Sequence, residues 1–239
     1  MNTKKINAKQ TKMIAHRGLS GIERENTCSA FVAAGNRSYF GIETDIHVTK
    51  DNGFVIFHDD NTARVGLDSL EIEQSTFQTL RSLQLTDTDG LRGRIDLRIP
   101  SLAEYIGICA KYEKTAVLEL KNRMTKEQIA SIAAQIDKMH DLQQVIFISF
   151  SLENLIDLRS LYPQQTVQFL TETYSDELLL QLQELGMDLD ILYTELTEER
   201  VAAIHKKGIK LNCWTCDDPE YAENLANWGI DYITSNILE

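Results

Sequence analysis

The stretch GIETDIHV, residues 41–48, alternates with the two-residue period of a β-strand. Successive side chains of a strand point to opposite faces, so Glu43, Asp45 and His47 share one face. The apolar residues and Thr44 occupy the other face, which in a barrel would contact the core or the surrounding helices. Residues 41–48 therefore predict a strand that directs two carboxylates and an imidazole to the same side.

Similar strand-like stretches alternate with helix-like patterns along the whole chain. They comprise residues 12–16, 40–48, 115–121, 145–150, 166–171, 190–193, 210–215 and 231–234. Strands that alternate with helices form parallel sheets, and eight such strands close a barrel. We therefore expect an α/β fold, a TIM (β/α)8 barrel, in which residues 1–239 form a single domain.

Several of the expected helices carry start signals. Ser101 with Glu104, and Thr125 with Gln128, fit the capping box, in which each side chain bonds the backbone amide of the other residue. Pro219 follows an aspartate at a plausible first helical position. These signals support the alternation of strands and helices.

Two segments depart from the alternating pattern. Residues 61–99 are long and charged, and they follow a short extra strand at residues 54–57. We expect this segment to be a small insertion at the rim of the barrel after the second strand region, with a helix around residues 76–83. The polar, basic start of the chain predicts a short mobile arm at residues 1–11.

The composition indicates an ordinary globular protein. Of the 239 residues, 43% are hydrophobic, which is enough for a sizeable core, and the net charge is −12. This negative charge makes a general affinity for nucleic acid or anionic membranes unfavourable. No apolar run approaches the length of a membrane span, and no signal peptide is recognisable. The four cysteines fit unpaired thiols, so we expect a cytoplasmic protein, whose oligomeric state the sequence leaves open.

The motif CWTC contains two cysteines, Cys213 and Cys216, in a C-x-x-C spacing. Redox pairs of this spacing normally begin a helix, where the thiolate is stabilised, whereas this motif lies at the end of a predicted strand. The sequence holds no second C-x-x-C that would complete a zinc site. We expect two buried thiols without a redox function.

Three carboxylates near strand ends are candidates for a metal site. Glu43 and Asp45 would repel each other in a buried setting, and a divalent cation removes that cost. Glu119 ends another apolar strand, in VLELK, and could complete an oxygen site for Mg2+ or Ca2+, while Lys121 beside it could bind a phosphate. The alternative for each stretch is a solvated edge strand or a strand-end ion pair.

Two apolar strands end in histidine. The strand in MIAHRG ends in His16, and the strand in GFVIFHDD ends in His58. A single histidine at a strand end is usually only polar rim, but two of them near three carboxylates can serve as general acid and general base. His47 is a weaker candidate, and we expect His140 and His205 at the surface.

The chain resembles the glycerophosphodiester phosphodiesterase family. The resemblance is carried, in order, by MIAHRG, RENTCSAF, GIETDIHVTKDNGFVIFHDD, RIPSLAEYI, LELK, ISFS and CWTCDDPE, which run from about Met13 to Asn236. It implies a TIM barrel with a small insertion after the second strand region. It also implies cation-dependent hydrolysis of small glycerophosphodiesters to an alcohol and glycerol 3-phosphate.

The resemblance also implies roles for residues that match the family's motifs. These are His16 and His58 as acid and base; Glu43, Asp45 and Glu119 as metal ligands; Arg17 and Lys121 on the phosphate; and Trp214 as an aromatic wall for the glycerol end. Three features depart from the family pattern. Arg24 stands where the family usually has a proline before E-N-T, and Cys216-Asp217 stands where it usually has an asparagine after W-T-x. The chain ends at Glu239, so we expect the closing eighth helix to be missing or minimal.

Other functions remain open at the level of sequence. A related barrel phosphodiesterase could act on lysophospholipids or phosphoinositide headgroups, and an apolar stripe on the insertion would favour this. The residues available for it are Leu67, Leu70, Ile72, Phe77, Leu80 and Leu83, which core packing explains equally well. A non-catalytic phosphate-binding module would lack an acid/base histidine. The alcohol headgroup, the choice between Mg2+ and Ca2+, the role of each histidine and the nucleophile stay open.

Overall fold

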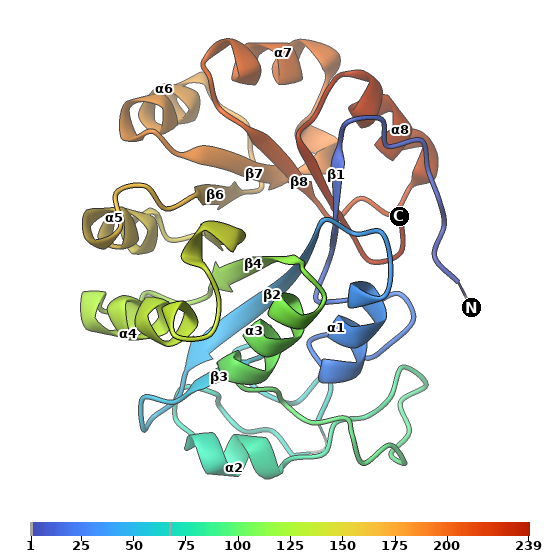
Figure 1. Ribbon diagram of the computed structural model, residues 1–239, viewed down its shortest axis with the longest axis vertical. Helices are drawn as coiled ribbons and strands as arrows, with labels where there is room; N and C mark the ends of the chain where they lie inside the picture. The colour runs from blue at the N-terminus through green and yellow to red at the C-terminus, as the bar shows by residue number, and fades with distance from the viewer. Residues whose placement is uncertain (1, 67) are drawn as a thin grey trace.

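Parallel strands form the centre of the computed structural model, which describes residues 2–66 and 68–239 (Figure 1). Their order around the sheet is β8-β7-β6-β5-β4-β2-β1-β9. The strands are β1 (Lys12–Ala15), β2 (Gly41–Val48), β4 (Thr115–Leu120), β5 (Val145–Ser149), β6 (Val167–Thr171), β7 (Asp188–Leu192), β8 (Leu211–Trp214) and β9 (Tyr232–Ser235). Cys216 N donates to Thr234 O at 3.0 Å where β8 meets β9. The strands therefore form a nearly closed eight-stranded barrel, which confirms the expected fold.

Helices surround the barrel and alternate with its strands (Figure 1). They are α1 (Cys28–Gly35), α3 (Leu102–Lys111), α4 (Lys126–Asp137), α5 (Leu152–Leu161), α6 (Asp176–Leu185), α7 (Glu198–Lys206) and α8 (Pro219–Asn227), with 3-10 turns η1 (Leu142–Gln144) and η2 (Tyr193–Glu195). Both predicted capping boxes are formed, at Ser101 and Thr125, and Pro219 begins α8. Within the described residues, β9 is the last element of the chain.

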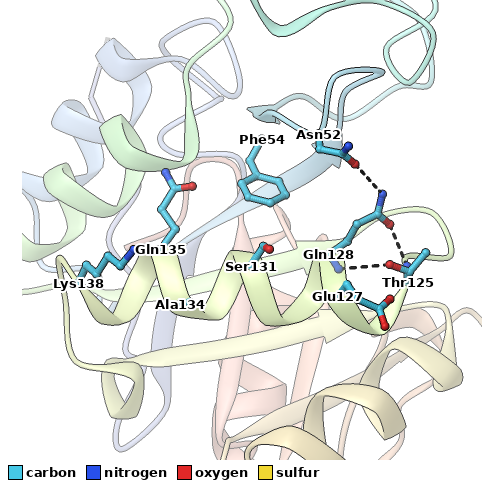
Figure 2. A pocket seen from close by; sticks show the side chains of 9 residues that line it. All are labelled: Asn52, Phe54, Thr125, Glu127, Gln128, Ser131, Ala134, Gln135 and Lys138. Atoms are coloured by element: carbon cyan, nitrogen blue, oxygen red, sulfur yellow. Dashed lines mark hydrogen bonds between the residues drawn. The ribbon is translucent and has the colours of Figure 1, made fainter.

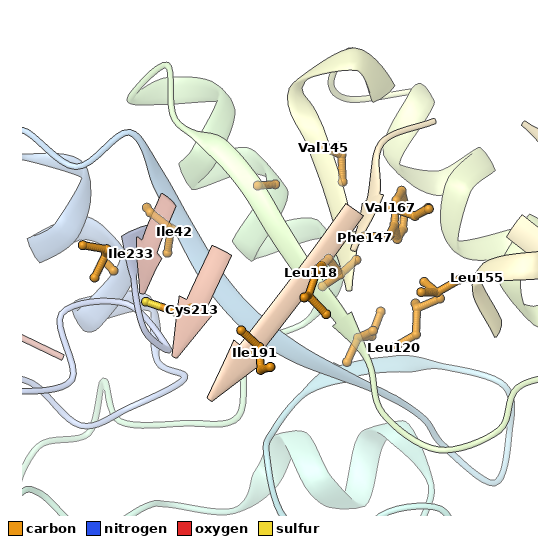
Figure 3. Close-up of a cluster of buried hydrophobic side chains, with 14 of the residues drawn as sticks. Ile42, Leu118, Leu120, Val145, Phe147, Leu155, Val167, Ile191, Cys213 and Ile233 are labelled. Carbon is orange, nitrogen blue, oxygen red and sulfur yellow. The ribbon is translucent and has the colours of Figure 1, made fainter. Parts of the chain in front are cut away.

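The main hydrophobic core lies between the strands and the surrounding helices. Figure 3 shows part of it, with side chains that leave the strands on their outer face, among them Ile42, Leu118, Phe147 and Ile191, all fully buried. Residues of opposite parity point into the barrel, where a smaller apolar cluster includes Ile14, Val117, Ile146, Leu170 and Tyr232. Polar side chains that point inward therefore lie beside this inner cluster, on strands whose outer faces pack against the main core.

The segment between β2 and α3 forms the expected insertion. It contains β3 (Phe54–Ile56), which pairs antiparallel with β2, and α2 (Phe77–Ser82) at the bottom of the view in Figure 1. Its core consists of Val55, Phe57, Val65, Ile72, Leu80, Leu85, Leu97 and Ile99. Leu70, Phe77 and Leu83 pack against the same cluster, and Leu67 lies outside the described residues. These contacts use most of the apolar side chains of the insertion for its own core, whereas Leu91 and Ile95 are exposed.

The segment before β1 runs beside the end of the chain. Lys4 N donates to Ile237 O and Ile6 N donates to Glu239 O, both at 3.0 Å. These contacts place residues 4–6 beside the end of the chain, the mobility of residues 1–11 stays a prediction, and Met1 lies outside the described residues. Among the described helices, none is both long and apolar enough to cross a bilayer.

Candidate active site

The turn after β1 brings His16 and Arg17 to the open end of the barrel. Arg17 has φ of 52° and Gly18 has φ of 74°, both in the left-handed region. The Arg17 backbone N–H donates to Glu43 Oε2 at 2.8 Å, which stabilises this strained conformation. Glycine is required next to it, because a Cβ on Gly18 would lie 2.7 Å from the carbonyl carbon of Ala30 in α1. The strand therefore ends in a tight turn that presents an imidazole and a guanidinium together.

The three predicted carboxylates meet inside the barrel. Glu43, Asp45 and Glu119 each offer an oxygen, and these oxygens all lie within 4.8 Å of one another. Asp45 and Glu119 are register neighbours on adjacent strands, and none of the three side chains is more than 7% exposed. Lys121 Nζ lies 2.9 Å from Glu119 Oε1 and 3.5 Å from Asp45 Oδ1. We call Glu43, Asp45 and Glu119 the carboxylate triad.

Burial and mutual repulsion change the protonation of the triad. Burial, and then the neighbouring Asp45, raise the pKa of Glu119 to about 8 and that of Glu43 well above its usual value. Burial alone would also raise the pKa of Asp45, but Lys121 and Arg17 hold it below its usual value. In the absence of a cation, the triad therefore keeps protons that exposed carboxylates would lose.

The triad has the chemistry of a site for a hard divalent cation. Oxygens that share one Mg2+ or Ca2+ ion bind at about 2.0–2.6 Å from it, so they lie within about 5 Å of one another. The spacing of 4.8 Å fits this limit. A cation would also remove the repulsion that keeps the triad protonated. Asn26, which donates from Nδ2 to Asp45 Oδ2 at 2.8 Å, would orient one of the ligands.

His16 is fixed by a side chain that comes from the far end of the chain. Its Nδ1–H donates to Asn236 Oδ1 at 2.7 Å. The amide is oriented by Asp217 Oδ2, which accepts from Asn236 Nδ2 at 2.6 Å. Burial, and then the neighbouring Arg17, lower the pKa of His16 to about 4. At neutral pH the imidazole is therefore neutral, with a free lone pair on Nε2.

His58 is held by a carboxylate instead. Its Nδ1–H donates to Asp59 Oδ1 at 2.6 Å, while Asp59 Oδ2 accepts from Arg64 Nε at 2.7 Å. The buried His47 lies behind it, with Nε2 3.3 Å from the His58 carbonyl oxygen. Burial lowers the pKa of His58, and the Asp59 and Asp45 carboxylates offset part of this effect. The pKa of His58 stays below its usual value, because Arg17 and Lys121 add to the effect of burial and the hydrogen bond to Asp59 opposes the shift without reversing it.

An ion-pair chain connects Arg17 to the insertion. Arg17 Nη1 donates to Glu25 Oε1 at 2.8 Å, and Arg64 binds both oxygens of Glu25 at 2.7 Å. Burial would raise the pKa of Glu25, but the two arginines lower it to about 2. Arg17 Nε also lies 3.7 Å from Asp45 Oδ2. The guanidinium of Arg17 is thus held between the triad and Glu25.

A cavity of about 200 Å3 joins these groups. It is lined by His16, Arg17, Glu43, His58, Glu119, Ile148, Phe150, Leu170, Glu172, Asp190, Trp214 and Thr234. Six of the eight residues that we predicted for the site line this cavity; of the remaining two, Asp45 belongs to the triad and Lys121 contacts it. The ring of Phe150 packs edge-on against Trp214 at 5.6 Å. The structure therefore gathers all the predicted site residues at one place.

A larger groove of about 760 Å3 lies elsewhere. Figure 2 shows it along α4, next to the turn between β2 and β3, where Gln128 reaches toward Asn52. None of the predicted site residues lines this groove. Its polar, open lining offers no counterpart to the paired histidines and carboxylates of the smaller cavity.

Comparison with known proteins identifies the family. The glycerophosphoryl diester phosphodiesterase family matches residues 16–238. The chain belongs to this family. A glycerophosphodiester phosphodiesterase from Caldanaerobacter subterraneus subsp. tengcongensis is 26% identical over 233 residues, covering 95% of this chain and 94% of the relative. The protein is accordingly an enzyme, a phosphoric diester hydrolase.

Solved structures of the family share the fold. A phosphodiesterase from Oleispira antarctica, in complex with the product sn-glycerol-3-phosphate, superposes with a TM-score of 0.86 at 26% identity, covering 98% of this chain and 96% of that one. A glycerophosphodiester phosphodiesterase from Parabacteroides distasonis superposes with a TM-score of 0.79 at 28% identity, covering 95% and 93% of the two chains. The barrel fold of this chain is thus shared with both of these solved structures.

The supporting residues were not identified from the sequence. Asn26 and Glu25 lie in the quoted stretch RENTCSAF, but nothing local shows that they face Asp45 and Arg17. Asn236 is separated from His16 by 220 positions, so only the closed barrel brings them together. Asp59 was visible as the residue after His58, and the pair HD was a usable signal for a carboxylate that orients the imidazole.

Proposed function

We propose that this phosphodiesterase hydrolyses glycerophosphodiesters to an alcohol and glycerol 3-phosphate, with a divalent cation held by the carboxylate triad. The observation that carries the proposal is the meeting of Glu43, Glu119, His16 and His58 around one cavity, with Arg17 beside them. When bound there, Mg2+ or Ca2+ supplies positive charge next to the phosphate and offsets the charge that develops in the transition state.

We propose that His16 is the general base. Its Nδ1–H is committed to the neutral amide of Asn236, and its pKa is lowered to about 4. The ring therefore offers Nε2 as an unprotonated acceptor at neutral pH. Nε2 removes the proton from the nucleophile, which is water or a hydroxyl of the substrate's own glycerol.

His58 then has the complementary role of general acid. The carboxylate of Asp59 accepts from its Nδ1 and stabilises the imidazolium, so that Nε2–H can be donated to the leaving alkoxide. An alkoxide is a poor leaving group without this proton. His47 supports this arrangement by holding the backbone of His58 in place.

Arg17 and Lys121 are placed to bind the phosphate. The guanidinium of Arg17 faces the cavity, and its planar fork can donate to two phosphate oxygens at once. Lys121 is paired with Glu119 and Asp45, so its ammonium adds a point charge beside the triad. Trp214 forms the aromatic wall that the glycerol end of the substrate would contact.

The positions of the stripe residues of the insertion favour a small substrate over a lipid. Ile72 and Leu80 are fully buried, and Leu70, Phe77 and Leu83 pack against the same internal cluster. The described part of the proposed stripe therefore offers little apolar surface to an acyl chain. The Oleispira structure holds glycerol 3-phosphate, which matches the product expected from a glycerophosphodiester.

A chelation experiment tests the proposed reaction. Glycerol 3-phosphate release from glycerophosphocholine is measured for protein stripped with EDTA, before and after the return of Mg2+ or Ca2+. We expect activity only after the cation is returned, and Glu43→Gln should not respond to it. Glu184→Gln, at an exposed position on α6, is the matched control and should behave as the wild type. Full activity in EDTA would disprove the role of the cation.

A further inference from the structure

A second polar group faces the interior of the barrel from β6 to β9. It consists of Gln168, Asp190, Asn212 and Thr234, none more than 2% exposed. Asp190 is paired in register with Leu170 on one side and with Asn212 on the other. Asp190 and Thr234 line the same cavity as the two histidines. The proposed acid–base chemistry does not use this group.

Asn212 fixes the orientation of Asp190. Its Nδ2 donates to Asp190 Oδ2 at 3.0 Å and to Gln168 Oε1 at 3.2 Å. Its Oδ1 accepts from Thr234 Oγ1 at 3.3 Å. Asn212 therefore uses both hydrogens of Nδ2 and its Oδ1 within the protein, and it holds one oxygen of the Asp190 carboxyl.

The other oxygen, Asp190 Oδ1, has no hydrogen-bond partner within residues 2–66 and 68–239, although it is fully buried. The buried Trp214 Nε1, from a residue that lines the same cavity, also finds no partner among the described residues. Buried polar atoms without partners are costly, so they commonly mark the place of a ligand or an ordered water. Asp190 and Trp214, which both line the cavity, thus each carry one buried polar atom without a partner among the described residues, and Gln168 Nε2 in the same polar group is another.

The chemistry of these atoms selects a hydroxyl group. An indole N–H can only donate, and a hydroxyl accepts from it. A hydroxyl also suits Asp190 Oδ1 in either protonation state, because it can donate to an ionised carboxylate and accept from a neutral carboxyl whose proton lies on Oδ1. A quaternary ammonium can do neither. Burial, and then the nearby Glu119, raise the pKa of Asp190 well above its usual value, which favours the neutral form.

We infer that Asp190 is a specificity-determining residue that hydrogen-bonds a hydroxyl of the glycerol moiety through Oδ1, with Asn212 as the residue that positions it. The inference rests on the proposed function, because it places the phosphate of the substrate at Arg17 and the glycerol on the side of Asp190 and Trp214. The proposed hydrogen bond would recognise a glycerol hydroxyl directly, in addition to the contact between the glycerol and the aromatic wall of Trp214.

Binding of two monoesters tests this inference without depending on the chemical step. Titration calorimetry with the Mg2+-loaded protein compares glycerol 3-phosphate with n-propyl phosphate, which has the same charge and no free hydroxyl. We expect the wild type to bind glycerol 3-phosphate about 10-fold to 100-fold more tightly. Asp190→Leu should weaken binding of glycerol 3-phosphate by a similar factor and leave n-propyl phosphate within about threefold.

Asp188→Asn is the matched control, since Asp188 lies two residues earlier on the same face of β7, bonded to Lys210 N, and does not line the cavity. If Asp190→Leu does not fold, Asp190→Asn keeps the shape of the side chain and should still reduce the preference for glycerol 3-phosphate over n-propyl phosphate. Equal binding of both esters by the wild type, or an equal loss of both in a folded Asp190 variant, would overturn the inference. Hydrolysis of glycerophosphocholine is measured in parallel. If the wild type hydrolyses this diester but binds both monoesters equally, the inference fails while the proposed function stands.

Discussion

Replacing Glu119 by glutamine should stabilise the cation-free protein above neutral pH. The folded protein holds this carboxyl at a pKa of about 8, whereas an unfolded glutamate titrates near 4.5. Between these values the folded state keeps a proton that the unfolded state has lost, so the free energy of unfolding falls as pH rises. At about 1.4 kcal/mol per pH unit, the loss reaches up to about 5 kcal/mol above pH 8.

Glutamine removes this loss because it cannot ionise, and it still offers an oxygen to Lys121. In urea titrations with EDTA, we expect Glu119→Gln to exceed the wild type by up to about 5 kcal/mol above pH 8, and the difference to vanish near pH 4. The pH dependence of His16 is present in both proteins and largely cancels in the comparison. Excess Mg2+ or Ca2+ should reverse the order, because the wild type binds the cation more tightly.

Glu184→Gln should match the wild type under all of these conditions, since Glu184 is exposed on α6. A Glu119→Gln variant that is less stable than the wild type at high pH in EDTA would refute the reasoning. That result would show that the charged carboxylate stabilises the barrel through its pairing with Lys121.

Three further predictions concern the histidines and the thiols. His16→Gln and His58→Gln should each lower kcat by about 10²–10⁴-fold, and a diester with a p-nitrophenyl leaving group should restore only the His58 variant; rescue of both or neither contradicts the assigned roles. Asp59→Asn should lower kcat about 10-fold and move the alkaline limb of the pH–rate profile to lower pH, because the carboxylate stabilises protonated His58; an unmoved limb argues for a merely structural Asp59. The double variant Cys213→Ala/Cys216→Ala should keep its activity with and without peroxide, because burial raises the pKa of Cys213 well above its usual value and that of Cys216 to about 11; peroxide inactivation confined to the wild type would show a redox role.

The sequence predicted those features of the fold that depend on local patterns. The alternation in GIETDIHV placed Glu43 and Asp45 on one face, and the structure directs both into the barrel. The capping boxes at Ser101 and Thr125 depend on residues three positions apart, and both are formed. Local hydrogen bonds and strand periodicity are properties of short segments, so a single sequence reveals them.

The remaining features depend on contacts between distant segments. Arg17 adopts a left-handed conformation that its residue type does not favour, because Glu43 binds its backbone N–H. β7 begins at Asp188 instead of residue 190, because a polar aspartate that accepts from Lys210 N resembles a turn residue in the sequence. Asp190 was placed in a strand but not in the site, since its direction into the cavity depends on closure of the barrel.

A crystal structure of the protein with glycerol 3-phosphate and Mg2+ or Ca2+ would test the central claim most directly. We predict one cation with a carboxylate oxygen from each member of the triad at about 2.0–2.6 Å. The phosphate should contact Arg17, and the Nε2 atoms of His16 and His58 should lie on opposite sides of the phosphorus. A cation bound away from the triad, or a phosphate that neither histidine can reach, would contradict the account.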